Sequence, residues 1–157
     1  MGLFDRCPIF YLGGCMPIEY IKILMPLAPS VNKLYVTGRN GRFKSPIAKE
    51  FDFECSKIFE SLSYGEKDKI AEWRTKDTDL DIRLYYYMPK LAVRTTKGTR
   101  RKKDFINLEK AQIDSLFSAL DIDDSQIMQL TKVLQICEKD LEGRCEIFIR
   151  EVGNYGD

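Results

Sequence analysis

Residues 79–88 alternate polar and apolar side chains in the order Asp-Leu-Asp-Ile-Arg-Leu-Tyr-Tyr-Tyr-Met. In an extended chain the even-numbered side chains of this stretch point to one side and the odd-numbered ones to the other. A period of two is typical of a half-buried β-strand. This strand is the starting point for the fold prediction.

Weaker patterns on both sides of this strand complete the prediction. Ser45 and Pro46 suit the first positions of a helix, because Ser caps free N–H groups and Pro has no N–H to lose. We expect residues 66–77 to form a short helix or a loop, and residues 139–143 to connect the last two strands as a hairpin. The predicted elements are strand 18–25, helix 46–63, strand 79–88, helix 107–120, strand 127–137 and strand 144–152. This order predicts an α+β fold, a single domain with one mixed β-sheet packed against two helices.

The length of 157 residues fits one domain. Residues 1–15 are predicted to be an N-terminal extension and residues 16–157 the folded domain, and Met16 could be an alternative start. The alternative for residues 1–15 is an N-terminal arm that packs on the domain. No stretch is long enough to span a membrane. The five cysteines include no C-x-x-C pair. We therefore expect a cytoplasmic protein with reduced thiols and no membrane partner.

The sequence contains no histidine. Ser-His-Asp catalysis, Cys-His catalysis and His-ligated zinc are therefore excluded. Any catalysis must use carboxylates, Lys, Arg, Tyr, Cys or a metal held by oxygen ligands.

The net charge of +1, from 25 basic and 24 acidic residues, argues by itself against binding of nucleic acid through bulk charge. The charges are segregated, however. Residues 89–103 contain no acidic residue and carry Lys90, Arg94, Lys97, Arg100, Arg101, Lys102 and Lys103. We expect a loop or mobile hairpin that binds phosphates and releases counterions; the alternative is a solvated loop balanced by acids elsewhere. The turn-rich segment 38–44 adds Arg39, Arg42 and Lys44.

Two acidic elements follow this basic segment. Asp104 ends it, and Asp121, Asp123 and Asp124 form a compact turn after the next predicted helix. Because that helix spans about 20 Å, the turn must fold back to approach Asp104, as it could if the following strand pairs beside the preceding one. Grouped carboxylates bind Mg²⁺, and Lys110 could neutralise a phosphate. The alternative is that the turn aspartates only cap and shape the turn.

Three short motifs occur in order along the chain. They are Pro-Ser-Val-Asn-Lys-Leu-Tyr at 29–35, Lys-Lys-Asp-Phe-Ile-Asn-Leu-Glu-Lys at 102–110 and Asp-Asp-Ser-Gln-Ile at 123–127. They resemble, respectively, the P-S-x-N-x-x-Y, basic-D-x-D-N-x-x-K and D-D-x-Q-[IV] motifs of the RusA family. These are phage- and prophage-associated Holliday junction resolvases, endodeoxyribonucleases of DNA recombination and repair.

The resemblance implies a RusA-like nuclease domain at 16–157. It also implies a homodimer that binds four-way DNA junctions and cuts them with Mg²⁺ as cofactor; Mn²⁺ is the alternative metal. By match, Asp104 and Asp124 would be catalytic and bind the metal, with Asp123 beside them, and Lys110 would be the essential lysine. Lys103 would match a basic DNA contact and Asn107 the motif asparagine. Because of their charge, we expect further DNA contacts from Lys102, Arg101, Arg100, Lys97, Arg94, Arg42 and Lys44.

One position departs from the family motif. The second aspartate of D-x-D-N is Ile106 here, and an isoleucine cannot bind a cation. Glu109 or Asp114 could replace it from the helix, or the site could bind metal more weakly and cut slowly. The remaining alternative is a relative that binds branched DNA without cutting it.

A third hypothesis is a binder of RNA or single strands. It would use Tyr85, Tyr87 and Phe43 as stacking surfaces. The competing interpretation is that these rings pack in the sheet or at a dimer face.

Overall fold

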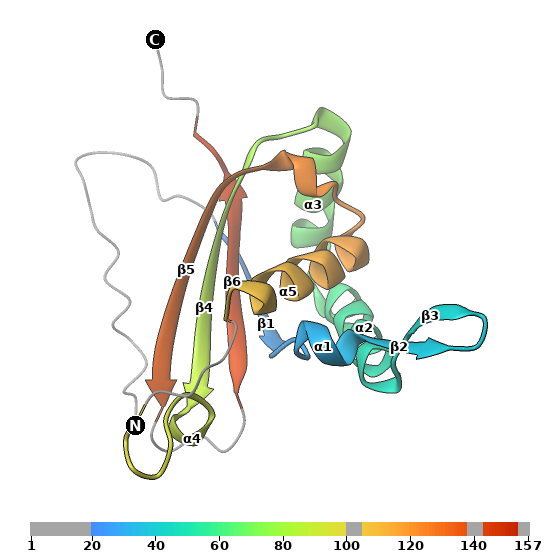
Figure 1. The fold of residues 1–157 in the computed structure, drawn as a ribbon. Helices are drawn as coiled ribbons and strands as arrows, with labels where there is room; N and C mark the ends of the chain where they lie inside the picture. Colours follow the sequence, from blue (N-terminus) through green and yellow to red (C-terminus); the bar gives the residue numbers. More distant parts are fainter. Residues whose placement is uncertain (1–19, 100–104, 138–142, 154–157) are drawn as a thin grey trace.

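The computed structural model describes residues 20–99, 105–137 and 143–153. A sheet of four strands carries the longer helices on one face (Figure 1). None of the helices in these ranges is long and apolar enough to cross a membrane. The elements are β1 (Ile21–Pro26), α1 (Val31–Leu34), β2 (Tyr35–Gly38), β3 (Gly41–Lys44), α2 (Pro46–Ser61), α3 (Tyr64–Lys76), β4 (Leu80–Pro89), α4 (Lys90–Val93), α5 (Phe105–Leu120), the 3₁₀ helix η1 (Asp124–Gln126), β5 (Ile127–Cys137) and β6 (Arg144–Glu151).

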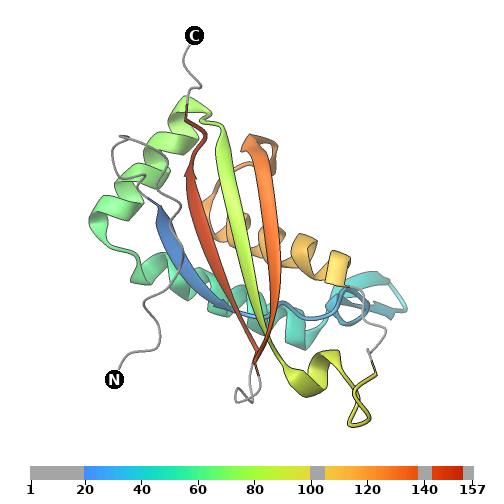
Figure 2. The ribbon, with the colours of Figure 1, turned by 90° about the vertical axis from the view of Figure 1, so that its left-hand side faces the viewer.

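Strand β4 lies inside the sheet, whose strand order is β1-β6-β4-β5. Its even-numbered side chains face the helices, and Leu80, Ile82 and Leu84 are completely buried. In Figure 2 the longer helices lie behind the sheet, and no described helix covers its other face. The predicted α+β fold with one mixed sheet is therefore confirmed.

The predicted hairpin between the last two strands is wrong. Strand β4 separates β5 from β6, pairing with β5 in parallel and with β6 in antiparallel orientation. Parallel neighbours need a long crossover, and residues 90–126 supply one through α5. Residues 138–142, which hold most of the expected hairpin connection, lie outside the described residues.

Of the two options predicted for residues 66–77, a short helix or a loop, the helix is confirmed, and it joins the two helices predicted to pack on the sheet. Residues 64–76 form α3, because Ser63 and Glu66 make a complete capping box at its start. Trp73 of α3 is fully buried. Gly65 lies in the first turn of α3.

Helix α5 is fixed against β1 by a buried polar side chain. The Gln112 side chain accepts a hydrogen bond from the Ala28 N–H at 2.8 Å and donates one to the Pro26 carbonyl at 3.0 Å. Both backbone groups belong to the chain that leaves β1, where regular pairing ends. This contact holds α5, the helix of the candidate site, in a fixed position on the core.

Candidate active site

The acidic turn lies between α5 and β5. Asp121 adopts a left-handed conformation with φ of 55° and forms an ion pair with Arg74 at 2.6 Å. The Asp123 carboxylate accepts a hydrogen bond from the Ser125 N–H at 2.8 Å and caps η1. Hydrogen bonds from the Ser125 side chain and backbone lower the pKa of Asp123. Two aspartates thus have turn and capping roles, and Asp124 is exposed beside them.

Two adjoining depressions run along α5, and together we call them the α5 groove. One has a volume of about 290 Å³ and is lined by Asp123 and Asp124 of the acidic turn, and the other has a volume of about 400 Å³ and reaches Lys44 at the end of β3. Asp114 and Ser118 border both. The groove is lined by Lys44, Asp52, Ser56, Asp114, Ser115, Phe117, Ser118, Ala119, Ile122, Asp123 and Asp124.

The Lys44 side chain lines the end of the α5 groove that lies away from the acidic turn. The Lys44 ammonium lies 2.6 Å from one Asp52 carboxylate oxygen, and the Ser115 hydroxyl donates to the other at 2.9 Å. The hydrogen bond to Asp52 raises the pKa of Lys44. Lys44 therefore keeps its charge at neutral pH and presents it next to Asp114.

The structure separates the two candidates for the role of the missing motif aspartate. Glu109 forms an ion pair with Lys132 of β5, whereas Asp114 borders the groove together with Asp123 and Asp124. Asp114 and Ser118 are four residues apart and so share one helix face, a spacing that could have identified this face from sequence. Lys110 is exposed on α5.

The acidic turn does not fold back to the start of α5. Strand β5 does pair beside β4, but in parallel, so the two strands are joined by a crossover that contains α5. The 16 residues of α5 span about 24 Å, with Phe105 at one end and the acidic turn beyond the other. Asp104 lies outside the described residues, although it is bonded to Phe105. In the described part of the chain, no group of three or more Asp, Glu, Cys or His residues is arranged to hold a metal.

The predicted basic loop is partly structured. Residues 90–93 form α4 and Val93 is buried, so this part is packed, contrary to the prediction of a loop. Arg94 and Lys97 are exposed beyond it, and Arg94 donates to the Gly98 carbonyl at 3.1 Å. Arg100, Arg101, Lys102 and Lys103 lie outside the described residues, and Asn107 belongs to the first turn of α5.

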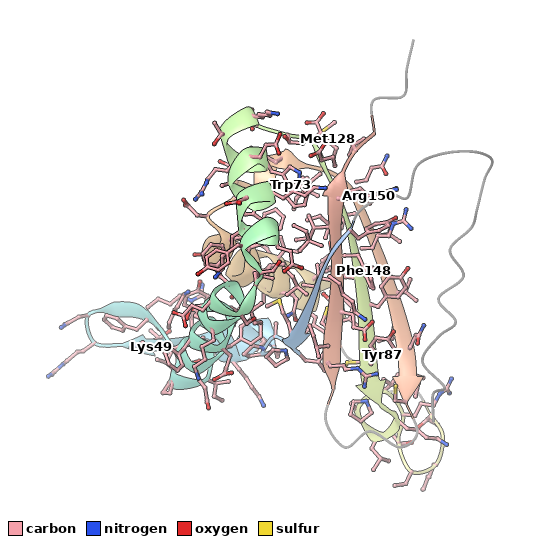
Figure 3. All side chains as sticks on the ribbon, turned by 180° about the vertical axis from the view of Figure 1, so that it is seen from behind. Lys49, Trp73, Tyr87, Met128, Phe148 and Arg150 are labelled. Atoms are coloured by element: carbon pink, nitrogen blue, oxygen red, sulfur yellow. The ribbon has the colours of Figure 1, made fainter. Side chains whose placement is uncertain are left out.

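The aromatic side chains on the sheet face opposite the helices pack on their neighbours. Tyr87, Phe148 and Arg150 lie along this face (Figure 3). The Tyr85 ring packs edge-on against Phe148 at 5.5 Å, and the Arg144 guanidinium lies 4.3 Å from the centre of the Tyr87 ring. These contacts agree with the competing interpretation, in which Tyr85 and Tyr87 pack within the sheet.

Comparison with known sequences gives the family. A search of curated proteins found no match. The sequence model of the family described as endodeoxyribonuclease RusA matches residues 26–150, which is most of the chain. The match begins at the last residue of β1 and ends one residue before the end of β6. All three motifs, at 29–35, 102–110 and 123–127, fall within the match. The chain therefore belongs to the RusA family of endodeoxyribonucleases.

Proposed function

We propose that this protein is a Mg²⁺-dependent endonuclease that cuts four-way DNA junctions. Its family acts on branched DNA junctions. The observation that carries the proposal is the α5 groove, in which Asp123 and Asp124 lie at one end, Lys44 lies at the other, and Asp114 borders both parts. Carboxylates beside exposed cations are what a site needs to hold a metal and a phosphodiester together.

The carboxylates that would hold the ion are Asp104, Asp123 and Asp124. Carboxylate oxygens are the donors that Mg²⁺ prefers, and the Asp123–Ser125 hydrogen bonds favour the charged form of Asp123. When bound, the metal supplies a more acidic water and stabilises negative charge on the phosphodiester. Lys110 is exposed on the same helix and would orient a phosphate by charge.

The length of α5 requires two chains for such a site. Ligand oxygens of one Mg²⁺ lie about 2.1 Å from the ion and therefore at most ~4 Å from each other. Asp104 is bonded to Phe105, and even Asp114 is nine residues further along the helix, about 14 Å. The carboxylates at the two ends of α5 thus meet at one ion only if they come from different subunits.

The edge strand β5 is the surface we propose for the homodimer. It has 11 residues and, among the described residues, pairs on one side only, which leaves its other edge available to a second copy. Its exposed large apolar side chains are Met128, Leu130, Leu134 and Ile136, and Leu91 of α4 is 60% exposed. An exposed apolar edge strand of this length favours pairing with a second copy.

This dimer would also explain how the two acidic elements meet. The start of α5 lies over β5, as the Glu109–Lys132 ion pair shows, and the acidic turn leads directly into β5 at Ile127. Both elements therefore border the same strand, at different points along it. An antiparallel two-fold pairing reverses this order in the partner and brings the partner subunit's Asp124 toward the start of α5.

Ile136→Lys is expected to convert the dimer into a monomer, because it places a charge in the apolar edge. Sedimentation equilibrium measures the change directly. Leu24→Lys is the matched control, since Leu24 is 57% exposed on β1 at the opposite edge of the sheet. Equal masses for the parent and the Ile136→Lys variant would rule out this interface.

The function is tested with a synthetic four-way junction and a linear duplex of the same sequence, each incubated with Mg²⁺, Mn²⁺ or EDTA. We expect symmetric cuts near the crossover with either metal and none in EDTA. If the parent binds the junction without cutting it, Ile106→Asp restores the motif carboxylate and tests for a decayed site. Absence of cutting by both proteins with either metal would refute the enzyme proposal.

A further inference from the structure

Strands β2 and β3 form a two-stranded hairpin that stands away from the body of the molecule (Figures 1 and 3). All eight strand residues are exposed. An isolated two-stranded hairpin is at best marginally stable in water, so its shape must be held from its base or by a partner. Gly41 has a φ of 123°, which the turn requires and other residues rarely adopt.

The base of the hairpin is firmly attached to the core. The Ser45 N–H donates to the Leu34 carbonyl at 2.8 Å, and the Ser45 hydroxyl donates to the Lys33 carbonyl at 2.5 Å. Lys44 pairs with Asp52 of α2. The hairpin is thus a projecting arm with a fixed root, and this root borders the α5 groove through Lys44.

The two faces of the arm differ in chemistry. Val36 and Phe43 are directly paired across the strands and form an apolar face, with 49% and 51% of their surface exposed. The opposite face carries Arg42, whose guanidinium lies 4.4 Å from the centre of the Tyr35 ring. Residues 32–44 include Lys33, Arg39, Arg42 and Lys44 and no acidic residue.

We propose that the arm inserts into the crossover of a four-way junction, with the Phe43 face against the bases and Arg39 and Arg42 on the phosphates. This inference rests on the proposed function and adds how the protein distinguishes a junction from a duplex. An apolar side chain that enters DNA must pay for unstacking, and this cost is least where stacking is already interrupted. The absence of acidic residues from 32–44 matches a polyanionic partner.

The proposal predicts different effects on DNA binding for the loss of Arg42 and for the loss of Phe43. A phosphate contact carries no information about the shape or sequence of the DNA, so loss of Arg42 weakens binding to any DNA. A contact with opened bases exists only at the crossover, so loss of Phe43 weakens junction binding alone. The ratio of junction affinity to duplex affinity therefore separates insertion from simple charge attraction.

The test measures affinities for the four-way junction and the linear duplex in EDTA over a range of salt concentrations. Phe43→Ala is expected to weaken junction binding about 10-fold, the size of one lost base–aromatic contact, and to leave duplex binding unchanged. Arg42→Ala is expected to weaken both and to reduce the slope of log K against log salt by about one. Tyr64→Ala is the control, because Tyr64 is an aromatic residue 88% exposed on α3.

A junction with 2-aminopurine at the crossover supplies a second measurement. Insertion predicts a rise in its fluorescence with the parent and a smaller rise with Phe43→Ala. If the parent prefers junctions and Phe43→Ala shows the same junction preference and the same fluorescence rise, insertion of the arm is refuted. A parent that binds junction and duplex equally would instead refute the proposed function, and the arm with it.

Discussion

Asp124→Asn is expected to lower the rate of junction cleavage by about 100-fold or more and to leave junction binding in EDTA intact. The amide keeps the shape of the side chain but loses the charge that a site of this kind directs at the cation and the reacting phosphodiester. Because Asp124 is exposed, the substitution should not disturb the core. Asp121→Asn is the matched control, since Asp121 lies in the same turn but pairs with Arg74. Equal rates for the two variants would contradict the role of Asp124.

Mixing of inactive subunits tests whether the site is shared between chains. A heterodimer of Asp104→Asn and Asp124→Asn subunits has both defects in one composite site and none in the other. We therefore expect single-strand nicking by the mixture, although each variant alone is inactive. If each site were built within one chain, both sites of the heterodimer would carry a defect. A mixture as inactive as its components would exclude the composite site.

Trp73→Ala is expected to destabilise the fold by about 3–5 kcal/mol, the usual effect of removing a large buried side chain. Trp73 is completely buried, and its indole N–H donates to the Glu151 carboxylate at 2.7 Å. The variant therefore leaves a cavity between α3 and the sheet and removes a hydrogen bond to the end of β6. Urea unfolding monitored by circular dichroism measures the loss.

Tyr64→Ala in the same helix provides the comparison for this stability effect. Tyr64 is 88% exposed, so its removal should change the free energy of unfolding by less than about 0.5 kcal/mol. A loss below 1 kcal/mol for Trp73→Ala would mean that α3 does not contribute to the cooperative core.

Part of the candidate site was predictable because its signals are local. The basic segment before Asp104, the position of Lys110 and the acidic turn can all be identified as short runs of residues. Asp114 was one of two candidates for the role of the missing aspartate, but its place beside Ser118 in the α5 groove was not predicted, because that place depends on how the turn packs against the helix. The position of Asp52 beside Lys44 depends in the same way on the packing of β3 against α2.

The sequence by itself determined the elements whose cause lies within a few residues. The alternation in 79–88 specifies β4, Ser45 and Pro46 specify the start of α2, and the segment 38–44, predicted to be turn-rich, contains the turn between β2 and β3. Each depends on a period, a cap or a turn conformation that neighbouring residues set. The three motifs in order likewise indicated the family that the match to residues 26–150 shows.

Only the tertiary structure decided which strands are neighbours and where the acidic elements lie. Strand β4 lies between β5 and β6, so these two strands do not pair as the expected hairpin. Their pairing follows the burial of apolar faces across the whole sheet and not proximity in sequence. The same parallel pairing places α5 in the crossover between β4 and β5, and the length of this helix separates its start from Asp124. This separation is a consequence of a rigid helix between two parallel strands, and no short-range pattern encodes it.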